Sequence, residues 1–507
     1  MTLKRDLFLL LSFLIVYFVY VNSSNFNINS CQALASGNIY TLTQNISSAG
    51  DCFTASGLNN VTIDGNGYKI TAVNRALIIG ANSRNISLSN AIIDAPGGVN
   101  VIGGPYDGCS SAGTADGIVI MNNIFISGGI VVGYGGGASG VCNMLVKDNR
   151  ILNSSVSLAN YQFSYLNNSI INNYIANGLT VGYTTGGIIR DNFVYRLTDE
   201  SSENVFNLDH INGYLVDNNT FLLNTSLTDA FSNNVFVFWY LTYSVVNNNK
   251  FLDYNQVASN PRKISLNMYG PNFINFTNNI DYTNNLNPSV NFQGVIKLRS
   301  GTSNSNFVNN TIIAVNSGYQ GLFVASSAGE DLPNNTFDSN TIITNASAAL
   351  TGDYGSNAIV KNNVLIGSPG MDLDWGYGCA GPIYVYNNIL IGISGAAYDP
   401  LGCSNSNSTN NIIYSETTPA STSTFTGNYN LFYPAYASGQ ANSISGQNPN
   451  FISPSGTIFD ANYNLVRNYH LNLASPAINA GTNLAAQGVT KDKDGIVTRE
   501  PLIKNWT

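Results

Sequence analysis

Short apolar runs alternate with polar corners along most of this chain, and an asparagine pair introduces many of the runs. The recurring mark is Asn-Asn, with Asp-Asn or Ser-Asn as stand-ins, followed closely by a β-branched or aromatic residue. It occurs at Asn122-Asn123, Asp148-Asn149, Asp191-Asn192, Asn218-Asn219, Asn248-Asn249, Asn278-Asn279, Asn309-Asn310, Asn362-Asn363, Asn387-Asn388 and Asn410-Asn411. Most successive marks lie roughly 20 to 30 residues apart, a period that is typical of solenoids.

The residue types at each mark predict strands rather than helices. Apart from glycine, asparagine enters the left-handed region most readily, so an asparagine pair before Val, Ile or Phe predicts a tight corner that feeds a short strand. Stacked corners also allow the amides to hydrogen-bond into a ladder along the axis. Because long amphipathic windows are scarce, we predict a parallel β-helix in which each coil holds two or three strands of about 3 to 6 residues.

Two segments carry a resemblance to known proteins. The run Asn60-Val61-Thr62-Ile63-Asp64-Gly65-Asn66-Gly67 resembles the entry coil of the right-handed parallel β-helix superfamily that includes pectin lyase. The resemblance covers most of residues 55–480 and implies that fold. The hydrolase branch carries an Asp-Asp pair and Gly-His-Gly, and pectate lyases carry a calcium-binding Asp cluster with Arg-x-Pro-x-x-Arg. None of these patterns occurs here.

The second resemblance lies near the C-terminus. The runs 427–433, 448–451 and 470–482, with Asp492, Asp494, Gly495 and Arg499, resemble the closing module of secreted bacterial and archaeal β-helix proteins, although Asn479 stands where those proteins usually carry Asp. A module of this kind is expected to cover the open end of the solenoid. The predicted organisation is a leader at 1–23, a right-handed parallel β-helix at 24–414, a Ser/Thr/Pro-rich linker or loop at 415–427, and the last coils with the cap at 428–507.

The leader predicts export. Lys4 and Arg5 precede an apolar run from Leu7 to Val21, about 15 residues, which is short for a bilayer span and suits a signal-peptide core. Cleavage near Ser23 and retention as an N-terminal membrane anchor both stay open. In either case we expect an extracellular or cell-surface protein, and if the segment is not cleaved it is the only expected contact with the membrane.

Cysteine usage agrees with an oxidising compartment. The six cysteines fall as sequence neighbours about one coil apart, Cys31 with Cys52, Cys109 with Cys142, and Cys379 with Cys403. Positions one coil apart stack in a β-helix, so three local disulfides are sterically reasonable, although six cysteines allow 15 pairings. Sequons such as Asn45-Ile46-Ser47 permit glycosylation, but their number is what an Asn-rich composition gives by chance.

The low content of charged residues and the negative net charge limit the classes of molecule that this protein is expected to bind. Charged residues make up 9% of the chain and the net charge is -8, so the surface is mostly neutral and hydrogen-bonding. Nucleic acid is excluded as a partner because its phosphates require clusters of Lys and Arg. No cysteine pair has zinc-site spacing and only His210 and His470 offer imidazoles, so no metal site or cofactor is expected. The turn Asp492-Lys493-Asp494-Gly495 resembles part of a calcium-binding loop, but the remaining ligands of such a loop are missing from the sequence.

One cluster of titratable residues offers acid–base chemistry. Its candidate catalytic residues are Asp199, Glu200, Glu203, Asp209 and His210, with Asp191 and Asp217 nearby. Stacking of coils would bring these groups onto one face, where paired carboxylates are what glycoside hydrolysis requires. A histidine or lysine would instead abstract a proton beside a uronate carboxylate. The alternative is a solvated loop.

Two further groups predict contact with a sugar. Lys297 and Arg299 lie on one strand with Arg262 and Lys263 about a coil earlier, and basic groups on one face suit neutralisation of a uronate. Flat rings that suit a sugar face occur in two places: Trp375 and Tyr377, beside the carboxylates of Asp372 and Asp374, and the run Phe238-Trp239-Tyr240. The alternative is that these rings pack in the core or fill turns.

These observations favour a protein that contacts a polysaccharide or surface glycan and is not clearly catalytic. Two alternatives stay open on the same scaffold: an extracellular polysaccharide lyase or glycoside hydrolase, and a structural coat or adhesion protein.

Overall fold

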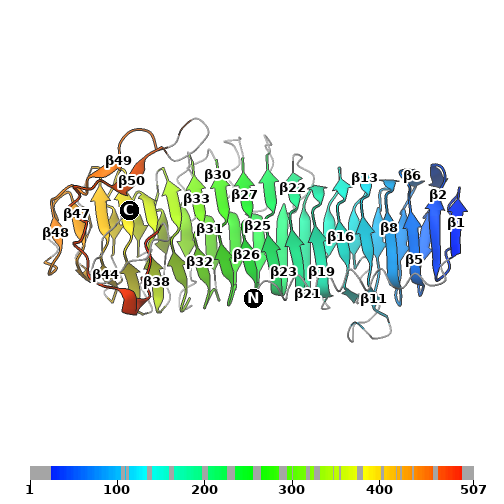
Figure 1. Cartoon of the computed structure of the whole chain (residues 1–507), viewed down its shortest axis with the longest axis horizontal. Helices are drawn as coiled ribbons and strands as arrows, with labels where there is room; N and C mark the ends of the chain where they lie inside the picture. Colours follow the sequence, from blue (N-terminus) through cyan, green and yellow to red (C-terminus); the bar gives the residue numbers. More distant parts are fainter. Residues whose placement is uncertain are drawn as a thin grey trace. The chain divides into compact units, whose positions relative to one another are not determined.

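A computed structural model describes residues 24–103, 109, 113–133, 140–158, 165–196, 204–224, 234–254, 264–284, 294–299, 301–315, 320–324, 332–345, 347–352, 356–373, 381–400, 403, 405–417, 420–422, 425–436, 439–458, 460 and 466–493. The leader predicted at 1–23 lies outside these residues. Within the described ranges no helix has the length and apolar character needed to cross a membrane. The chain forms two compact units, Met1–Tyr174 and Ile175–Thr507, each of which is a stack of parallel strands (Figure 1).

Unit 1 arranges its strands in three rows, and each strand pairs in parallel with its counterpart in the next coil. The first row holds β4 (Phe53–Ala55), β7 (Leu77–Ile79), β10 (Val99–Val101), β14 (Ile130–Val132) and β18 (Val156–Leu158). The second holds β1 (Ser24–Ile28), β2 (Asn38–Leu42), β5 (Asn59–Asp64), β8 (Arg84–Ser89), β11 (Ala115–Asp116), β12 (Val119–Met121), β15 (Val141–Cys142), β16 (Leu145–Lys147) and β19 (Tyr165–Ile171). The third holds β3 (Ile46–Ser48), β6 (Lys69–Ala72), β9 (Ile92–Asp94), β13 (Ile124–Ser127) and β17 (Arg150–Ile151), and β20 (Tyr174–Ala176) spans the unit boundary.

Unit 2 has the same three rows, and from here on we call the first, second and third rows row I, row II and row III. Row I holds β21 (Leu179–Arg190), β23 (Phe206–Asp217), β25 (Asn234–Trp239), β28 (Ile264–Tyr269), β31 (Gly294–Arg299), β34 (Gln320–Val324), β37 (Leu350–Gly352), β40 (Met371–Asp372) and β43 (Tyr398–Asp399). Row II continues from the second halves of β21 and β23 through β26 (Val245–Asn247), β29 (Asn275–Thr277), β32 (Asn306–Val308), β35 (Thr336–Asp338), β38 (Ala358–Lys361), β41 (Ile383–Tyr386), β44 (Asn407–Thr409) and β46 (Thr426–Asn428).

Row III of unit 2 holds β22 (Phe193–Arg196), β24 (Thr220–Leu223), β27 (Lys250–Asp253), β30 (Ile280–Thr283), β33 (Thr311–Ala314), β36 (Thr341–Thr344), β39 (Val364–Gly367), β42 (Ile389–Gly392), β45 (Ile412–Ser415), β47 (Leu431–Tyr433) and β48 (Ile444–Ser445). Parallel pairing therefore continues past the Ser/Thr/Pro-rich segment 415–427, which connects strands of the same stack. The predicted right-handed parallel β-helix is confirmed.

The two residues of each asparagine pair have different roles at the corner between rows II and III. In unit 2 the first residue of each pair is left-handed, for example Asn218 at φ 54° and Asn248 at φ 56°. The second residue is always asparagine and exposes no more than 2% of its surface. These buried residues are Asn192, Asn219, Asn249, Asn279, Asn310, Asn340, Asn363, Asn388, Asn411 and Asn430. In unit 1 the same ladder joins Asn123, Asn149 and Asn173.

Each ladder asparagine accepts two hydrogen bonds from the one before it. The backbone N of Asn279 donates to Oδ1 of Asn310 at 2.9 Å, and Nδ2 of Asn279 donates to the same oxygen at 3.2 Å. Asn310 then donates in the same two ways to Asn340, both at 2.9 Å. Because corner amides in a buried position have no water to bond, the ladder satisfies groups that would otherwise destabilise every coil.

The interior is mostly apolar, but several polar side chains of row III are buried in it, among them Arg196, Asp253 and Asp281. Inward-facing Phe206, Phe221 and Phe251 stack with ring centroids 3.9 and 5.3 Å apart. In the next coil Asp281 takes the place that Phe251 and Ile312 hold on either side. Its Oδ1 accepts a hydrogen bond from Ser265 Oγ at 3.1 Å. Burial, with the neighbouring Asp253 carboxyl, raises the pKa of Asp281 well above its usual value, so the group is buried as a neutral acid.

Replacing Asp281 is expected to stabilise unit 2 most at neutral pH. Below the unfolded-state pKa near 3.8 both states hold the proton. As pH rises toward the folded-state pKa only the folded state does, so wild-type stability falls by about 1.4 kcal/mol per pH unit. Urea denaturation of Asp281→Asn and wild type between pH 4 and 7 measures this difference. A stability difference that stays constant over this range would contradict a protonated Asp281.

The C-terminal segment packs along the flank of unit 2. β49 (Phe451–Ser453) and β50 (Asn468–Leu471) form an antiparallel pair (Figure 1). Phe451, Tyr469 and Leu471 bury outward-facing row III residues, among them Ile366 and Ile391. Further along, Asn410 exchanges hydrogen bonds with the backbone of Thr482, and Lys361 Nζ donates to Gly488 O, beside the short 3₁₀ helix η1 (Ala485–Gln487). The described part therefore covers an apolar outer face; coverage of the open end stays a prediction.

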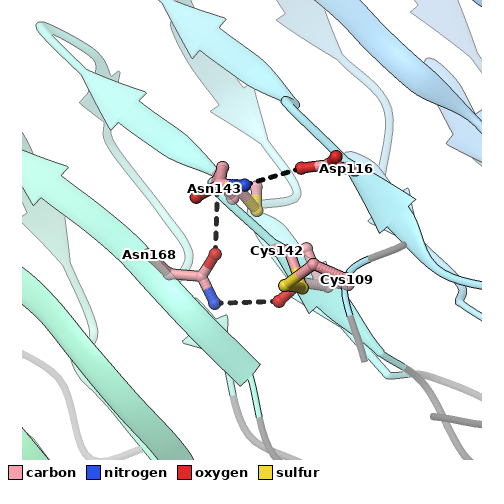
Figure 2. Close-up of a disulfide and its surroundings, with 7 residues drawn as sticks. Cys109, Asp116, Cys142, Asn143 and Asn168 are labelled. Atoms are coloured by element: carbon pink, nitrogen blue, oxygen red, sulfur yellow. Dashed lines mark hydrogen bonds between the residues drawn. A yellow bond between two sulfur atoms is a disulfide. The ribbon is translucent and has the colours of Figure 1, made fainter. Parts of the chain in front are cut away.

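Two of the expected disulfides form between adjacent coils. Cys31 bonds Cys52, and Cys109 bonds Cys142 with a Cα separation of 5.7 Å. Figure 2 shows the second bond beside Asn143, whose Nδ2 donates to Asp116 Oδ1. Cys403 is also disulfide-bonded, and Cys379 lies outside the described residues.

Candidate functional site

The corner between rows I and II of unit 2 carries bulky side chains in a backbone conformation that disfavours them. Tyr183, His210, Tyr240, Tyr243 and Phe273 all have φ between 47° and 54°. In other coils glycine or asparagine holds these corners: Gly213, Asn304 and Asn334 are the counterparts of Tyr243 and Phe273. A left-handed aromatic residue is strained by about 1 to 3 kcal/mol, and strain of this kind concentrates at functional sites.

A line of side chains runs beside these corners on the outward face of row I. Strand register places Asp209, Trp239, Tyr269 and Arg299 opposite one another on four successive coils. With adjacent parallel strands about 4.8 Å apart, Asp209 and Arg299 lie roughly 14 Å from each other along the stack. The outward face thus has an acid at one end, two large rings in the middle and a cation at the other end.

The rings contact each other from coil to coil. Ring centroids lie 4.5 Å apart for Tyr183 and His210, 4.7 Å for His210 and Tyr240, and 5.3 Å for Trp239 and Tyr269. Tyr243 and Phe273 stack at 5.0 Å. We call this set the aromatic surface: Tyr183, His210, Trp239, Tyr240, Tyr243, Tyr269 and Phe273.

The aromatic surface is open to solvent. Trp239 exposes 39% of its surface, Tyr240 41%, Tyr243 63% and Phe273 45%. Among the large apolar side chains of the described residues, few are this exposed, and these four lie on two adjacent coils. A contiguous exposed aromatic patch marks a binding surface rather than ordinary packing.

Ionisable groups stand at both ends of the aromatic surface. His210 Nδ1 and Asp209 Oδ1 form a hydrogen bond of 2.6 Å, which orients the imidazole so that its face lies against Tyr183 and Tyr240. At the other end the Arg299 guanidinium lies 5.6 Å from the Tyr269 ring centroid, a cation–π geometry. Partial desolvation, with Tyr269 and Asp209 nearby, raises the pKa of Tyr240, so its hydroxyl stays protonated at neutral pH.

Lys297 shares a strand face with Arg299 and is partly buried. Burial, followed by repulsion from Arg299, lowers the pKa of Lys297 to about 8. Lys297 is in register with Asn267 of the preceding coil. Asn267 is buried, and its Oδ1 has no hydrogen-bond partner among the described residues. A recessed polar line therefore runs parallel to the exposed rings.

The structure places the predicted site residues in three groups. It joins Asp209 and His210 to Lys297 and Arg299, because the aromatic surface connects the two pairs. Asp372 lies on the Lys297 line, three coils further along. Asp199, Glu200, Glu203, Arg262, Lys263, Asp374, Trp375 and Tyr377 lie outside the described residues.

Two acids of the predicted cluster belong to a different corner. Asp191 Oδ1 accepts from Asn218 Nδ2 at 2.7 Å, and Asp217 Oδ1 accepts from Asn247 Nδ2 at 2.9 Å. Both carboxylates lie in row II or at its end, where they accept amides of the neighbouring coil. Their hydrogen bonds give them a role in joining coils.

Sequence reasoning missed Tyr183, Tyr243, Tyr269 and Phe273. Of the run Phe238-Trp239-Tyr240, Phe238 is buried in the core whereas Trp239 and Tyr240 are exposed. Aligning the coils would have given a usable signal: Tyr243 and Phe273 occupy the corner position that Asn304 and Asn334 fill in later coils. An aromatic residue where the repeat calls for asparagine points to function.

The described residues form no metal site beside the aromatic surface. Across the described parts of the chain, no group of three or more His, Cys, Asp or Glu side chains is placed to hold a metal ion. At the turn considered for calcium, Asp492 and Lys493 are described, whereas Asp494 and Gly495 lie outside the described residues.

Comparison with known proteins gives only distant similarity. No protein-family model matches this chain, and no curated protein sequence matches it. The chain is similar to the A-module of mannuronan C-5 epimerase AlgE6 from Azotobacter vinelandii, with 15% identity over 69% of this chain and 89% of that one and a TM-score of 0.31.

Other similar structures include the tailspike protein of E. coli bacteriophage HK620 in complex with hexasaccharide, with 12% identity over 80% of this chain and 71% of that one and a TM-score of 0.27. The surface adhesin PfbA of Streptococcus pneumoniae has 12% identity over 72% of this chain and 82% of that one, with a TM-score of 0.26. Likeness at this level carries no argument about function, and the fold assignment rests on the strand register.

Proposed function

We propose that this protein acts outside the cell or at its surface, where unit 2 binds a polysaccharide along the aromatic surface. The observation that carries this proposal is the placement of exposed aromatic rings at left-handed corners that other coils give to asparagine or glycine. Backbone strain together with exposure to solvent supports a role of these rings in binding a ligand. The disulfides between coils support an extracellular setting.

The surface has the chemistry of a sugar site. Sugar rings present apolar C–H faces and a rim of hydroxyls, so they suit flat aromatic rings flanked by hydrogen-bonding groups. Trp239 and Tyr269 provide the flat rings, and Asp209, His210 and Arg299 provide donors and acceptors at the two ends. The repeat of the coils matches a linear, repetitive ligand better than a compact one.

A screen of the purified protein tests this proposal. We expect binding to at least one polysaccharide on a glycan array, without depolymerisation of that polymer. The absence of binding across neutral and acidic polysaccharides would contradict the proposal and favour a structural coat or adhesion protein.

Polysaccharide cleavage by β-elimination is the second candidate, and Lys297 is the residue that favours it. A lysine whose pKa is lowered to about 8 can accept a proton near neutral pH, while Arg299 on the same face is placed to neutralise a uronate carboxylate.

If the protein cleaves a uronate polymer, its rate is expected to rise as pH passes about 8, because Lys297 must be neutral to act as the base. Lys297→Met is expected to abolish that rise, whereas Lys250→Met, an exposed lysine of row III, is expected to leave it intact. Assay of unsaturated products between pH 6 and 10 measures both. Activity that persists in Lys297→Met would exclude Lys297 as the base.

A further inference from the structure

A cavity lies on the flank of unit 2, and no residue of the aromatic surface lines it. It has a volume of about 320 Å³ and opens between the row II–row III corner and the C-terminal segment. The corner contributes Asn362, Asn387 and Ile389, and the C-terminal segment contributes Val466, Tyr469 and His470. We call this cavity the flank pocket. Its size is at the lower end of the roughly 300 to 1,000 Å³ range of small-molecule sites.

The first residues of the asparagine pairs form a separate, outer series of hydrogen bonds, and one run of this series ends at the flank pocket. Asn362 Nδ2 donates to Asp338 Oδ1 at 2.9 Å, and Asn387 Nδ2 donates to Asn362 Oδ1 at 2.8 Å. The next residue of the series, Asn410, turns away and donates to the Thr482 carbonyl instead. The amide of Asn410 is therefore bonded to Thr482 rather than to Asn387 Oδ1, and Asn387 lines the pocket.

The charges around the flank pocket are balanced. The Arg467 guanidinium forms an ion pair with Glu416 and also donates to the Gly456 carbonyl. Asp492 and Lys493, which both line the pocket, are consecutive and of opposite sign. Among the described lining residues a charged ligand would meet no unbalanced counter-charge, so the site favours a neutral molecule.

Apolar and hydrogen-bonding groups line the flank pocket together. Val364, Ile389 and Val466 supply apolar contacts, and the Asn387 amide supplies an acceptor. His470 Nδ1 bonds Asn468 Oδ1 at 2.6 Å, which orients the imidazole at the rim. Apolar walls with a few oriented polar groups suit one or two sugar rings. We infer that the flank pocket binds a neutral mono- or disaccharide, independently of the polysaccharide proposed for the aromatic surface.

Saturation-transfer NMR and titration with glucose, galactose, mannose and N-acetylglucosamine test this inference. At least one of these sugars is expected to bind the full-length protein with a millimolar Kd. Val466→Trp, which fills the pocket from its exposed lip, is expected to abolish binding, and Asn387→Gly is expected to weaken it at least fivefold. Glycine suits Asn387 because its φ is 58°.

The matched control is Asn309→Gly. Asn309 has φ 55° and donates to Asn278 Oδ1 at 2.7 Å, as Asn387 does to Asn362, but it lies outside the flank pocket. This variant and Trp239→Ala are expected to bind the sugar as wild type does. The inference is overturned if none of the four sugars binds, if Val466→Trp binds unchanged, or if Trp239→Ala loses the sugar, which would assign the binding to the aromatic surface.

Discussion

Asn310→Ala is expected to destabilise the coils around it by about 3 kcal/mol, because a buried backbone donor loses its only acceptor in the ladder. Asn310 Oδ1 accepts both the backbone N and Nδ2 of Asn279, and Asn310 Nδ2 donates to Phe276 O. In a solenoid each coil contacts mainly its neighbours, so the loss is local. Hydrogen exchange of the amides in β29, β30, β32 and β33 measures it.

The control for this prediction is the other member of the same pair. Asn309→Gly keeps the left-handed corner and removes only an exposed hydrogen bond to Asn278. Its expected cost is below about 1 kcal/mol. Equal effects of the two substitutions would contradict the separation of roles, in which the first residue shapes the corner and the second joins the coils.

The fold could be predicted because its signal is local and repeated. Each asparagine pair defines its own corner, and the same pair recurs in neighbouring coils. The strands Val245–Asn247 and Lys250–Asp253 can therefore be predicted from the corner at Asn248 and Asn249. The stand-ins were also informative: Asp148 and Asp191 replace only the first residue of the pair, and the buried second residue stays asparagine.

The candidate site was harder to predict because it depends on register between coils. Asp209 and Arg299 are 90 residues apart in sequence numbering, yet they lie on one line because Trp239 and Tyr269 occupy the matching positions between them. The lengths of the segments between strands set this register, and composition does not reveal it. Asp281 was unpredictable for a similar reason, since only pairing with Phe251 and Ile312 shows that it points inward.

Trp239→Ala combined with Tyr269→Ala is expected to weaken binding of the best polysaccharide by about 100-fold, since central aromatic rings usually carry most of a surface's affinity. Both rings face outward, and Phe238 and Met268 beside them keep the core intact. Phe26→Ala is the matched control, because Phe26 is also exposed and stacked on a tyrosine, but in unit 1. Isothermal titration measures all three proteins.

Equal loss of affinity in Phe26→Ala would point to general adhesion of exposed rings. Unchanged affinity in the double variant would remove Trp239 and Tyr269 from the binding surface. Circular dichroism and thermal denaturation of each variant distinguish lost binding from lost folding.

The central claim is that aromatic residues occupy left-handed corners for the sake of a ligand. Exchanging Tyr243→Asn together with Phe273→Asn tests it most directly, because asparagine is the residue that later coils use at Asn304 and Asn334. We predict that unit 2 becomes as stable or up to about 1 kcal/mol more stable per site while its affinity for the polysaccharide falls about tenfold. Lower stability with unchanged affinity would contradict the claim and make the aromatic corners part of the fold.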